Sequence, residues 1–198
     1  MEMTRLEKRF VNRRKKAERN IARVRQRLQE LPSKAIRDVL ELGCGTGAVA
    51  ADLAAAYALN VYGTDYDYAQ IEIARNTQPE SEHLHYRVED ATHLSFQDTS
   101  FDLVISQNVF HHLSDWKAAV QEVARVLRPG GYLMWLDLAF PKFIGRLFQP
   151  LIKNYSLYSF ADIRSIFEMC GFEQLFYEKL VHGLFVQHHL VLQKSEEK

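Results

Sequence analysis

The most constraining feature of this sequence is a short apolar run that leads directly into a glycine-rich turn. Residues 39–47 read VLELGCGTG, and a stretch of helix-forming residues follows them. Glycine permits positive φ and lets a ligand approach the backbone, and the start of the next helix offers N–H groups to an anionic ligand. The segment therefore predicts a strand, a tight turn and a helix that together bind a nucleotide-like molecule.

The turn alone leaves the class of ligand open. Gly43, Gly45 and Ala48 have the G-x-G-x-x-G/A spacing of a site that binds NAD. The same turn suits other ligands that contain adenosine. Positions further along the chain have to decide between these alternatives.

Beyond the turn, short β-branched or apolar runs alternate with longer helical stretches. This alternation predicts an open, doubly wound parallel sheet that binds ligands beyond the carboxyl ends of its strands. The expected strands lie near 37–42, 59–64, 83–88, 101–107 and 131–138, and the expected helices near 47–57, 67–77 and 115–126.

The last third of the chain has a different pattern. A helix expected near 159–170 is followed by apolar runs at 172–180 and 184–193, with His182 and Gly183 between them. Two such runs predict antiparallel strands that close the sheet. The expected fold is thus an α/β, Rossmann-like, doubly wound sheet of seven strands, mostly parallel with an antiparallel C-terminal strand.

A long amphipathic helix is expected before the sheet, over residues 4–30. Thr4 and Glu7 have the spacing of a capping box, and Pro32 ends the helix. Apolar residues recur on one side of this helix, whereas Lys and Arg crowd the other side. The apolar side has to pack against another part of the protein.

Charge divides the chain close to the end of this helix. Residues 1–37 hold 13 Lys or Arg and 4 Asp or Glu, and the remainder holds 12 and 21, so a front of net charge +9 precedes a body of net charge −9. A basic segment can bind nucleic acid or an anionic membrane surface, and it can equally lie across its own acidic domain or stay solvated. We expect residues 1–35 to form a basic cap or lid and residues 36–198 to form the main domain.

Neither export nor a membrane span is indicated. No apolar run approaches the length needed to cross a bilayer, and the amino terminus lacks the apolar stretch of a secretory signal. Cys44 and Cys170 lie far apart without metal-ligand spacing, so we expect reduced thiols and no metal site. These features predict a cytoplasmic protein.

Five short segments follow one another in a characteristic order between residues 36 and 138. They are ELGCGTG at 41–47, GTD at 63–65, EDATHLSF at 89–96, SFDLV at 100–104 and RVLRPGG at 125–131. In this order and spacing they resemble the class I S-adenosylmethionine (SAM)-dependent methyltransferases, in particular the small-molecule group that includes ubiquinone and menaquinone C-methyltransferases. The resemblance implies SAM as the cofactor and S-adenosylhomocysteine as the product.

The resemblance also implies a set of cofactor-binding residues. Asp65, at the carboxyl end of the second strand, is expected to accept hydrogen bonds from both ribose hydroxyls. Asp90 and the Ala91 N–H are expected to contact the adenine, and Glu41 is expected near the amino end of the methionine moiety. The remaining members of the expected site are Gly43, Cys44, Gly45, Tyr66 and Gln107.

Each of these acids also has a structural alternative. Asp65 can serve as a helix cap, Asp90 can sit in an ordinary loop turn, and Glu41 can be an acid at a strand end.

Methyl transfer asks for positioning in a dry pocket more than for a particular base. Residues 106–113 read SQNVFHHL, so the N-P-P-Y type of motif is absent, which argues against DNA adenine or protein glutamine as substrate. His112 is a candidate proton acceptor, with loop packing as its alternative, and His111 is the weaker candidate. Tyr155 and Tyr158 are candidates to line a substrate pocket.

The function expected is methylation of a small, partly apolar molecule under residues 140–158, with the N-terminal helix as part of the lid. Two alternatives stay open within SAM chemistry. One is a methyltransferase that uses the basic helix to hold RNA or another anionic substrate. The other is a SAM-binding regulatory protein that transfers nothing. An NAD oxidoreductase leaves the acidic loop at Asp90 unexplained.

Overall fold

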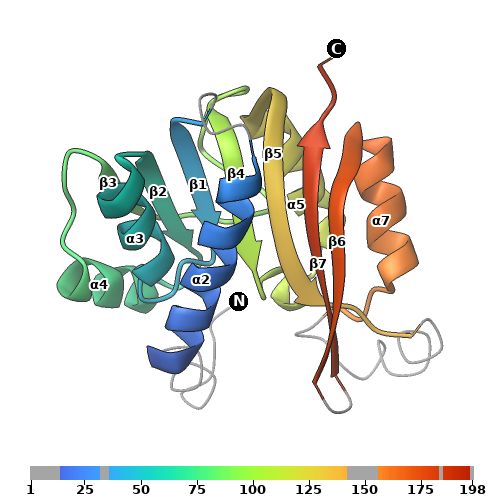
Figure 1. Ribbon diagram of the computed structural model, residues 1–198, viewed down its shortest axis with the longest axis horizontal. Helices are drawn as coiled ribbons and strands as arrows, with labels where there is room; N and C mark the ends of the chain where they lie inside the picture. The colour runs from blue at the N-terminus through green and yellow to red at the C-terminus, as the bar shows by residue number, and fades with distance from the viewer. Residues whose placement is uncertain (1–13, 32–35, 142–155, 183–184, 197–198) are drawn as a thin grey trace. The chain divides into compact units, whose positions relative to one another are not determined.

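The computed structural model describes residues 14–31, 36–141, 156–182 and 185–196 (Figure 1). The chain divides into two compact units, Met1–Asp90 and Ala91–Lys198. The capping box expected at Thr4 and the pocket candidate Tyr155 lie outside the described residues.

The first unit contains three parallel strands. β1 (Asp38–Leu42) and β3 (Leu84–Val88) pair on either side of β2 (Asn60–Asp65). Helices α3 (Ala48–Tyr57) and α4 (Tyr68–Thr77) connect the strands. The core is formed by side chains that are entirely or almost entirely buried: Leu40, Leu42, Leu53, Val61 and Ile71.

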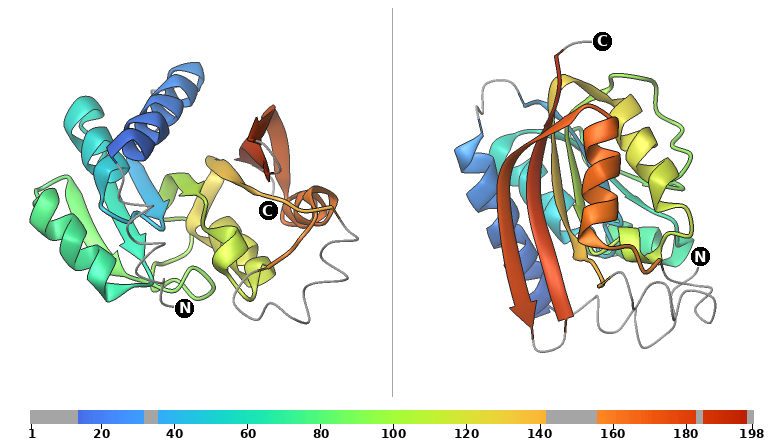
Figure 2. Two further views of the ribbon diagram at one scale, coloured as in Figure 1. Left: turned by 90° about the horizontal axis from the view of Figure 1, so that it is seen from below. Right: turned by 90° about the vertical axis from the view of Figure 1, so that its right-hand side faces the viewer.

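Helix α2 (Arg14–Glu30) packs beside α3 in this unit, as both views in Figure 2 show. Val24 and Leu28 are buried on its inner side. Arg25 of α2 forms two hydrogen bonds with Asp52 of α3, the Nε–Oδ2 distance being 2.8 Å. The helix ends two residues before Pro32, as predicted. One basic side chain thus lies against an acid of the same unit, which is one of the alternatives for the basic segment.

The second unit contains the other four strands. β5 (Leu127–Leu138) pairs in parallel with β4 (Phe101–Gln107) and antiparallel with β7 (Phe185–Lys194), and β7 pairs antiparallel with β6 (Phe172–His182). Helix α5 (Trp116–Val126) leads from β4 to β5, after a 3₁₀ turn, η2 (Phe110–His112). Helix α7 (Phe160–Met169) precedes β6 and lies beside the β6–β7 pair in Figure 1.

An aromatic core holds this second unit together. Trp135 of β5 is fully buried. Its ring packs edge to face against Phe110 at 6.3 Å and Phe167 at 5.7 Å between centroids, and lies 6.4 Å from the ring of Tyr158. Tyr158, a candidate pocket residue, is therefore a core residue of this unit, with 4% of its surface exposed.

The strand order is β3-β2-β1-β4-β5-β7-β6, which is a seven-stranded mixed sheet. The expected fold class is confirmed, including the antiparallel strand near the C-terminus. One boundary was predicted wrongly, because β5 begins at Leu127 and not near residue 131. Leu127 already pairs with Phe101, and a register shift carries the strand through the Pro-Gly-Gly sequence that we expected to be a turn. No helix among the described residues is long and apolar enough to span a membrane.

Candidate functional site

The glycine-rich turn of the first unit follows β1 and is bonded to the end of β2. Gly43, Gly45 and Gly47 have φ of 66°, 54° and 73°, values that glycine adopts without strain. The Cys44 N–H donates to the carbonyl of Thr64 at 2.8 Å. The Gly45 N–H donates to the carboxylate of Asp65 at 3.0 Å. Sequence and structure thus agree on a turn whose shape is fixed by its backbone.

Asp65 is held by backbone donors on both of its oxygens. Oδ2 accepts from the Gly45 N–H, and Oδ1 accepts from the Asp67 N–H, both at 3.0 Å. These two backbone donors fix the orientation of the Asp65 carboxylate, whose oxygens act only as hydrogen-bond acceptors. Asp65 is half-buried, and the side chain of Tyr66 beside it is 52% exposed. An oriented acceptor pair beside an exposed aromatic ring fits the ribose diol of an adenosyl cofactor.

Glu41 has a structural role in the same unit. Its side chain is buried, and Oε2 accepts from the Ala50 N–H in the first turn of α3 at 2.9 Å. Gly47, the N-cap of this helix, provides no side-chain cap, so Glu41 supplies it from β1. Burial raises the pKa of the Glu41 carboxyl to about 8. Its expected contact with the methionine moiety stays a prediction.

Two glycines of the motif region are required by packing against Tyr86. A Cβ on Gly47 would lie 2.3 Å from the Tyr86 hydroxyl oxygen, and one on Gly63 would lie 2.9 Å from its ring. The hydroxyl donates to the Gly47 carbonyl at 3.1 Å. Tyr86 is thus a residue that the sequence analysis missed, and it supports the turn from β3.

Burial also raises the pKa of Cys44 well above its usual range, so Cys44 is no nucleophile at neutral pH.

Asp90 and Ala91, the two residues expected to contact the adenine, stand on either side of the boundary between the units in the sequence. Asp90, the last residue of the first unit, is exposed, and Ala91, the first residue of the second, is 9% exposed. Their contacts with a cofactor stay predictions.

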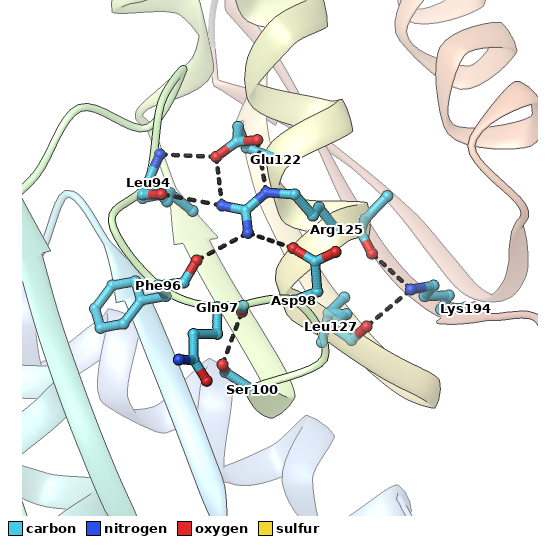
Figure 3. Close-up of polar contacts among 10 residues, drawn as sticks. Leu94, Phe96, Gln97, Asp98, Ser100, Glu122, Arg125, Leu127 and Lys194 are labelled. Atoms are coloured by element: carbon cyan, nitrogen blue, oxygen red, sulfur yellow. Dashed lines mark hydrogen bonds and ion pairs between the residues drawn. The ribbon is translucent and has the colours of Figure 1, made fainter.

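Arg125 holds the loop that follows Ala91 in the second unit (Figure 3). Its guanidinium donates to the carbonyls of Leu94 at 3.0 Å and Phe96 at 2.8 Å, and to the carboxylates of Glu122 and Asp98. Glu122 also accepts from the Leu94 N–H at 2.8 Å. The hydrogen bond with Arg125 lowers the pKa of Glu122. Sequence analysis placed Arg125 in a motif but gave it no role; the structure shows that it fastens the loop.

The carboxyl end of β4 carries several polar groups. Asn108 has a φ of 60° and accepts a hydrogen bond on Oδ1 from the Gln187 amide at 2.5 Å. Gln107, an expected cofactor ligand, is half-buried, and its Oε1 is buried with no hydrogen-bond partner. A buried, unpaired amide oxygen is costly without a ligand or water, so Gln107 suits a binding role.

The turn η2 places His111 against Asp137 of β5. Asp137 is completely buried, and one of its oxygens bonds the Nδ1 atom of His111. The neighbouring His112 packs its ring on that of His111, with 4.0 Å between centroids. Asp137 was missed from the sequence. Its signal was a single acid in the otherwise apolar run LMWLDL at 133–138.

Comparisons with known proteins show that this chain is similar to methyltransferases. A sequence profile of a family described as a methyltransferase domain matches residues 40–135. An O-methyltransferase from Pyrenophora dematioidea is 37% identical over 124 residues, which are 61% of this chain and 45% of that protein. Residues 40–135 of this chain therefore belong to the class I SAM-dependent methyltransferases. SAM is accordingly its cofactor.

Other methyltransferases match over more of the chain. The demethylmenaquinone methyltransferase of Staphylococcus haemolyticus is 26% identical, covering 86% of this chain and 83% of that protein. A crystal structure assigned to a sarcosine dimethylglycine methyltransferase of Galdieria sulphuraria has a TM-score of 0.79 at 18% identity, over 93% of this chain and 88% of that one, and it shows the shared fold. The chain spans about half the length of the first curated methyltransferases that it matches, 45%, 51% and 58%.

Proposed function

We propose that this protein is a SAM-dependent methyltransferase acting on a small, partly apolar molecule. The observation that carries the proposal is the Asp65 carboxylate, which is oriented by the Gly45 and Asp67 N–H groups beside the glycine turn. Family membership supports the same cofactor.

The residues of the first unit would bind and orient the cofactor. SAM supplies a methyl group that its sulfonium has already activated. The Asp65 carboxylate would accept hydrogen bonds from the hydroxyls of the ribose. The glycines with positive φ would let the cofactor approach the backbone. Glu41 would act mainly by fixing the start of α3 through the Ala50 N–H.

We infer that the methyl acceptor is a hydroxyl oxygen. The relatives from Pyrenophora dematioidea and Penicillium expansum are both named O-methyltransferases. A carbon acceptor is the second candidate, because the demethylmenaquinone methyltransferase matches over most of both chains. A lid that includes residues 1–35 and a cytoplasmic location stay predictions from the sequence.

Two measurements test the proposal. Thermal unfolding with SAM and with NAD shows which cofactor binds. A ligand at 100 times its dissociation constant adds about 2.7 kcal/mol to the free energy of unfolding. We expect SAM and S-adenosylhomocysteine to raise the melting temperature and NAD to leave it unchanged.

Turnover then separates the alternatives. Release of S-adenosylhomocysteine that depends on a hydroxylated acceptor would exclude a purely regulatory SAM-binding protein. Turnover that requires RNA, and falls steeply with salt, would favour the anionic-substrate alternative instead.

A further inference from the structure

Asp137 collects three hydrogen-bond donors in a site that excludes water. Its Oδ2 atom accepts from the Phe110 N–H at 2.6 Å, and its Oδ1 atom accepts from the Leu138 N–H at 2.6 Å and also bonds the Nδ1 atom of His111. The carboxyl group is completely buried. Because the two backbone donors fix the carboxylate plane, the His111 ring bonds an acceptor whose orientation is already set.

This contact determines which nitrogen of His111 carries a proton. A carboxylate is an acceptor only, so Nδ1 must be the donor. In the neutral ring the lone pair is then on Nε2, which is the arrangement of a histidine that works as a base. The His111 side chain keeps 11% of its surface exposed, so it is not sealed in the core.

The backbone of η2 is fastened on its far side as well. The Ser156 N–H donates to the His111 carbonyl at 2.9 Å, and the Ser156 hydroxyl donates to the Leu113 carbonyl. Both His111 and Asp137 stand at or just after the carboxyl ends of parallel strands, β4 and β5. Ligands of such sheets bind beyond these ends.

Three further titratable groups surround the pair. The His112 ring packs on His111, and the Tyr158 hydroxyl, whose pKa is raised by burial and by Asp137, faces the carboxylate. His188 of β7 is the cross-strand partner of Asp137, and burial lowers the pKa of His188 to about 4, so it is neutral near pH 7. Among these three groups, His188 therefore provides no positive charge beside Asp137 near pH 7.

We propose that His111 is a catalytic general base and Asp137 its positioning residue, and that the acceptor is a weakly acidic hydroxyl. This inference rests on the proposed function. As the hydroxyl oxygen forms a bond to the methyl carbon, the carbon–sulfur bond breaks and its electron pair stays on sulfur. The hydroxyl proton moves to Nε2 of His111. The imidazolium is stabilised by the Asp137 carboxylate and then gives its proton to water.

The test uses substituted phenols of graded acidity as acceptors, from nitrophenol to methylphenol. A general base matters most when the hydroxyl is undissociated, and its loss typically costs about 100- to 10,000-fold. We expect His111→Ala to lose activity on this scale with methylphenol and to lose little with nitrophenol. His83→Ala, a histidine of the first unit bonded to Asn60, is the control that should keep full activity.

Each other outcome contradicts the proposal. An equal loss for all phenols would mean that His111 is only structural. The acidity-dependent loss in His112→Ala instead of His111→Ala would make His112 the base. SAM binding without turnover of any phenol would overturn the hydroxyl acceptor, whereas absence of SAM binding would overturn the proposed function itself.

Nitrogen NMR of His111 tests the positioning role, and its first measurement uses the wild-type protein. We expect a proton on Nδ1 in the neutral wild-type protein, and a shift of population toward Nε2–H in Asp137→Asn with a matching loss of rate on methylphenol. A wild-type protein with its proton on Nε2 would rule out the proposed base.

Discussion

The two units hold a buried carboxyl group in different ways. In the first unit the Glu41 carboxyl accepts one hydrogen bond, from the Ala50 N–H at the start of α3, and its pKa rises to about 8. In the second unit Asp137 accepts from two backbone N–H groups and from His111. Burial with one donor favours the neutral form of Glu41, whereas the hydrogen bonds to Asp137 fix the orientation of its carboxyl group.

The expected cofactor residues of the first unit and the proposed base of the second unit also differ in what determines their positions. The turn at Gly43–Gly47 and Asp65 is shaped by backbone groups, and its residues lie within a recognisable motif. His111 and Asp137 are 26 residues apart and meet through side chains only because β4 and β5 pair. The cofactor region is therefore readable from the sequence, while the proposed base requires the fold.

The largest effect expected is on the pH dependence of stability through Glu41. A carboxyl whose pKa rises from 4.5 to about 8 on folding contributes stability that is fully present below pH 4.5 and is lost as the pH rises through 8. The loss amounts to about 3 to 5 kcal/mol at high pH. Glu41→Gln keeps an acceptor for Ala50 and should remove this loss, as denaturant unfolding between pH 4.5 and 9 can measure. Parallel curves for both proteins would show that Glu41 is not the group responsible.

Gly47→Ala should come next in size. The change combines left-handed backbone strain of about 1 to 2 kcal/mol with overpacking against Tyr86 of about 1 to 3 kcal/mol. Gly130→Ala is a matched control, because its φ is 76° but its Cβ would lie 3.6 Å from the nearest atom. Thermal unfolding should show a larger loss of stability for Gly47→Ala than for Gly130→Ala. Equal losses of stability would mean that the Tyr86 side chain moves aside.

Asp65→Ala tests the cofactor contact itself. Losing a hydrogen bond to a charged group costs about 1.5 to 3 kcal/mol, or about 10- to 150-fold in SAM affinity. Asp52→Ala, which removes the partner of Arg25 in the same unit, should leave the affinity unchanged. Calorimetry with both variants decides the matter, and equal SAM affinity in Asp65→Ala and wild type would exclude the ribose assignment.

The smallest expected effect is a loss of stability in the loop at Leu94–Phe96, which Arg125 holds by hydrogen bonds. Lysine cannot bond the Leu94 and Phe96 carbonyls and Glu122 together, so Arg125→Lys should cost about 1 kcal/mol. Amide exchange at Leu94 should become faster. Arg164→Lys, in an exposed pair with Glu168, should change nothing measurable. Unaltered exchange at Leu94 would mean that other contacts hold the loop.

The sequence predicted the fold well because its signals were local. The strand at Asp38–Leu42, the helix at Ala48–Tyr57 and the antiparallel pair β6–β7 are found within two residues of the expected ends. The start of β5 was missed because a long-range pairing, Phe101 with Leu127, overrode local turn propensity. The 3₁₀ turn at Phe110–His112 had no signal of its own.

The site was only partly predictable for a related reason. The expected roles of Asp65 and Asp90 came from a motif, and the structure adds the donors that orient Asp65. Which of two adjacent histidines faces a carboxylate depends on strand register, which the sequence alone does not contain. Tyr86 was likewise missed, because its contact with Gly47 joins residues 39 positions apart.

A crystal structure with S-adenosylhomocysteine tests the central claim most directly. If the glycine turn and Asp65 hold the adenosyl cofactor, both ribose hydroxyls will lie within hydrogen-bond distance of the Asp65 carboxylate. A ligand bound elsewhere, with neither ribose hydroxyl within hydrogen-bond distance of Asp65, would contradict the account.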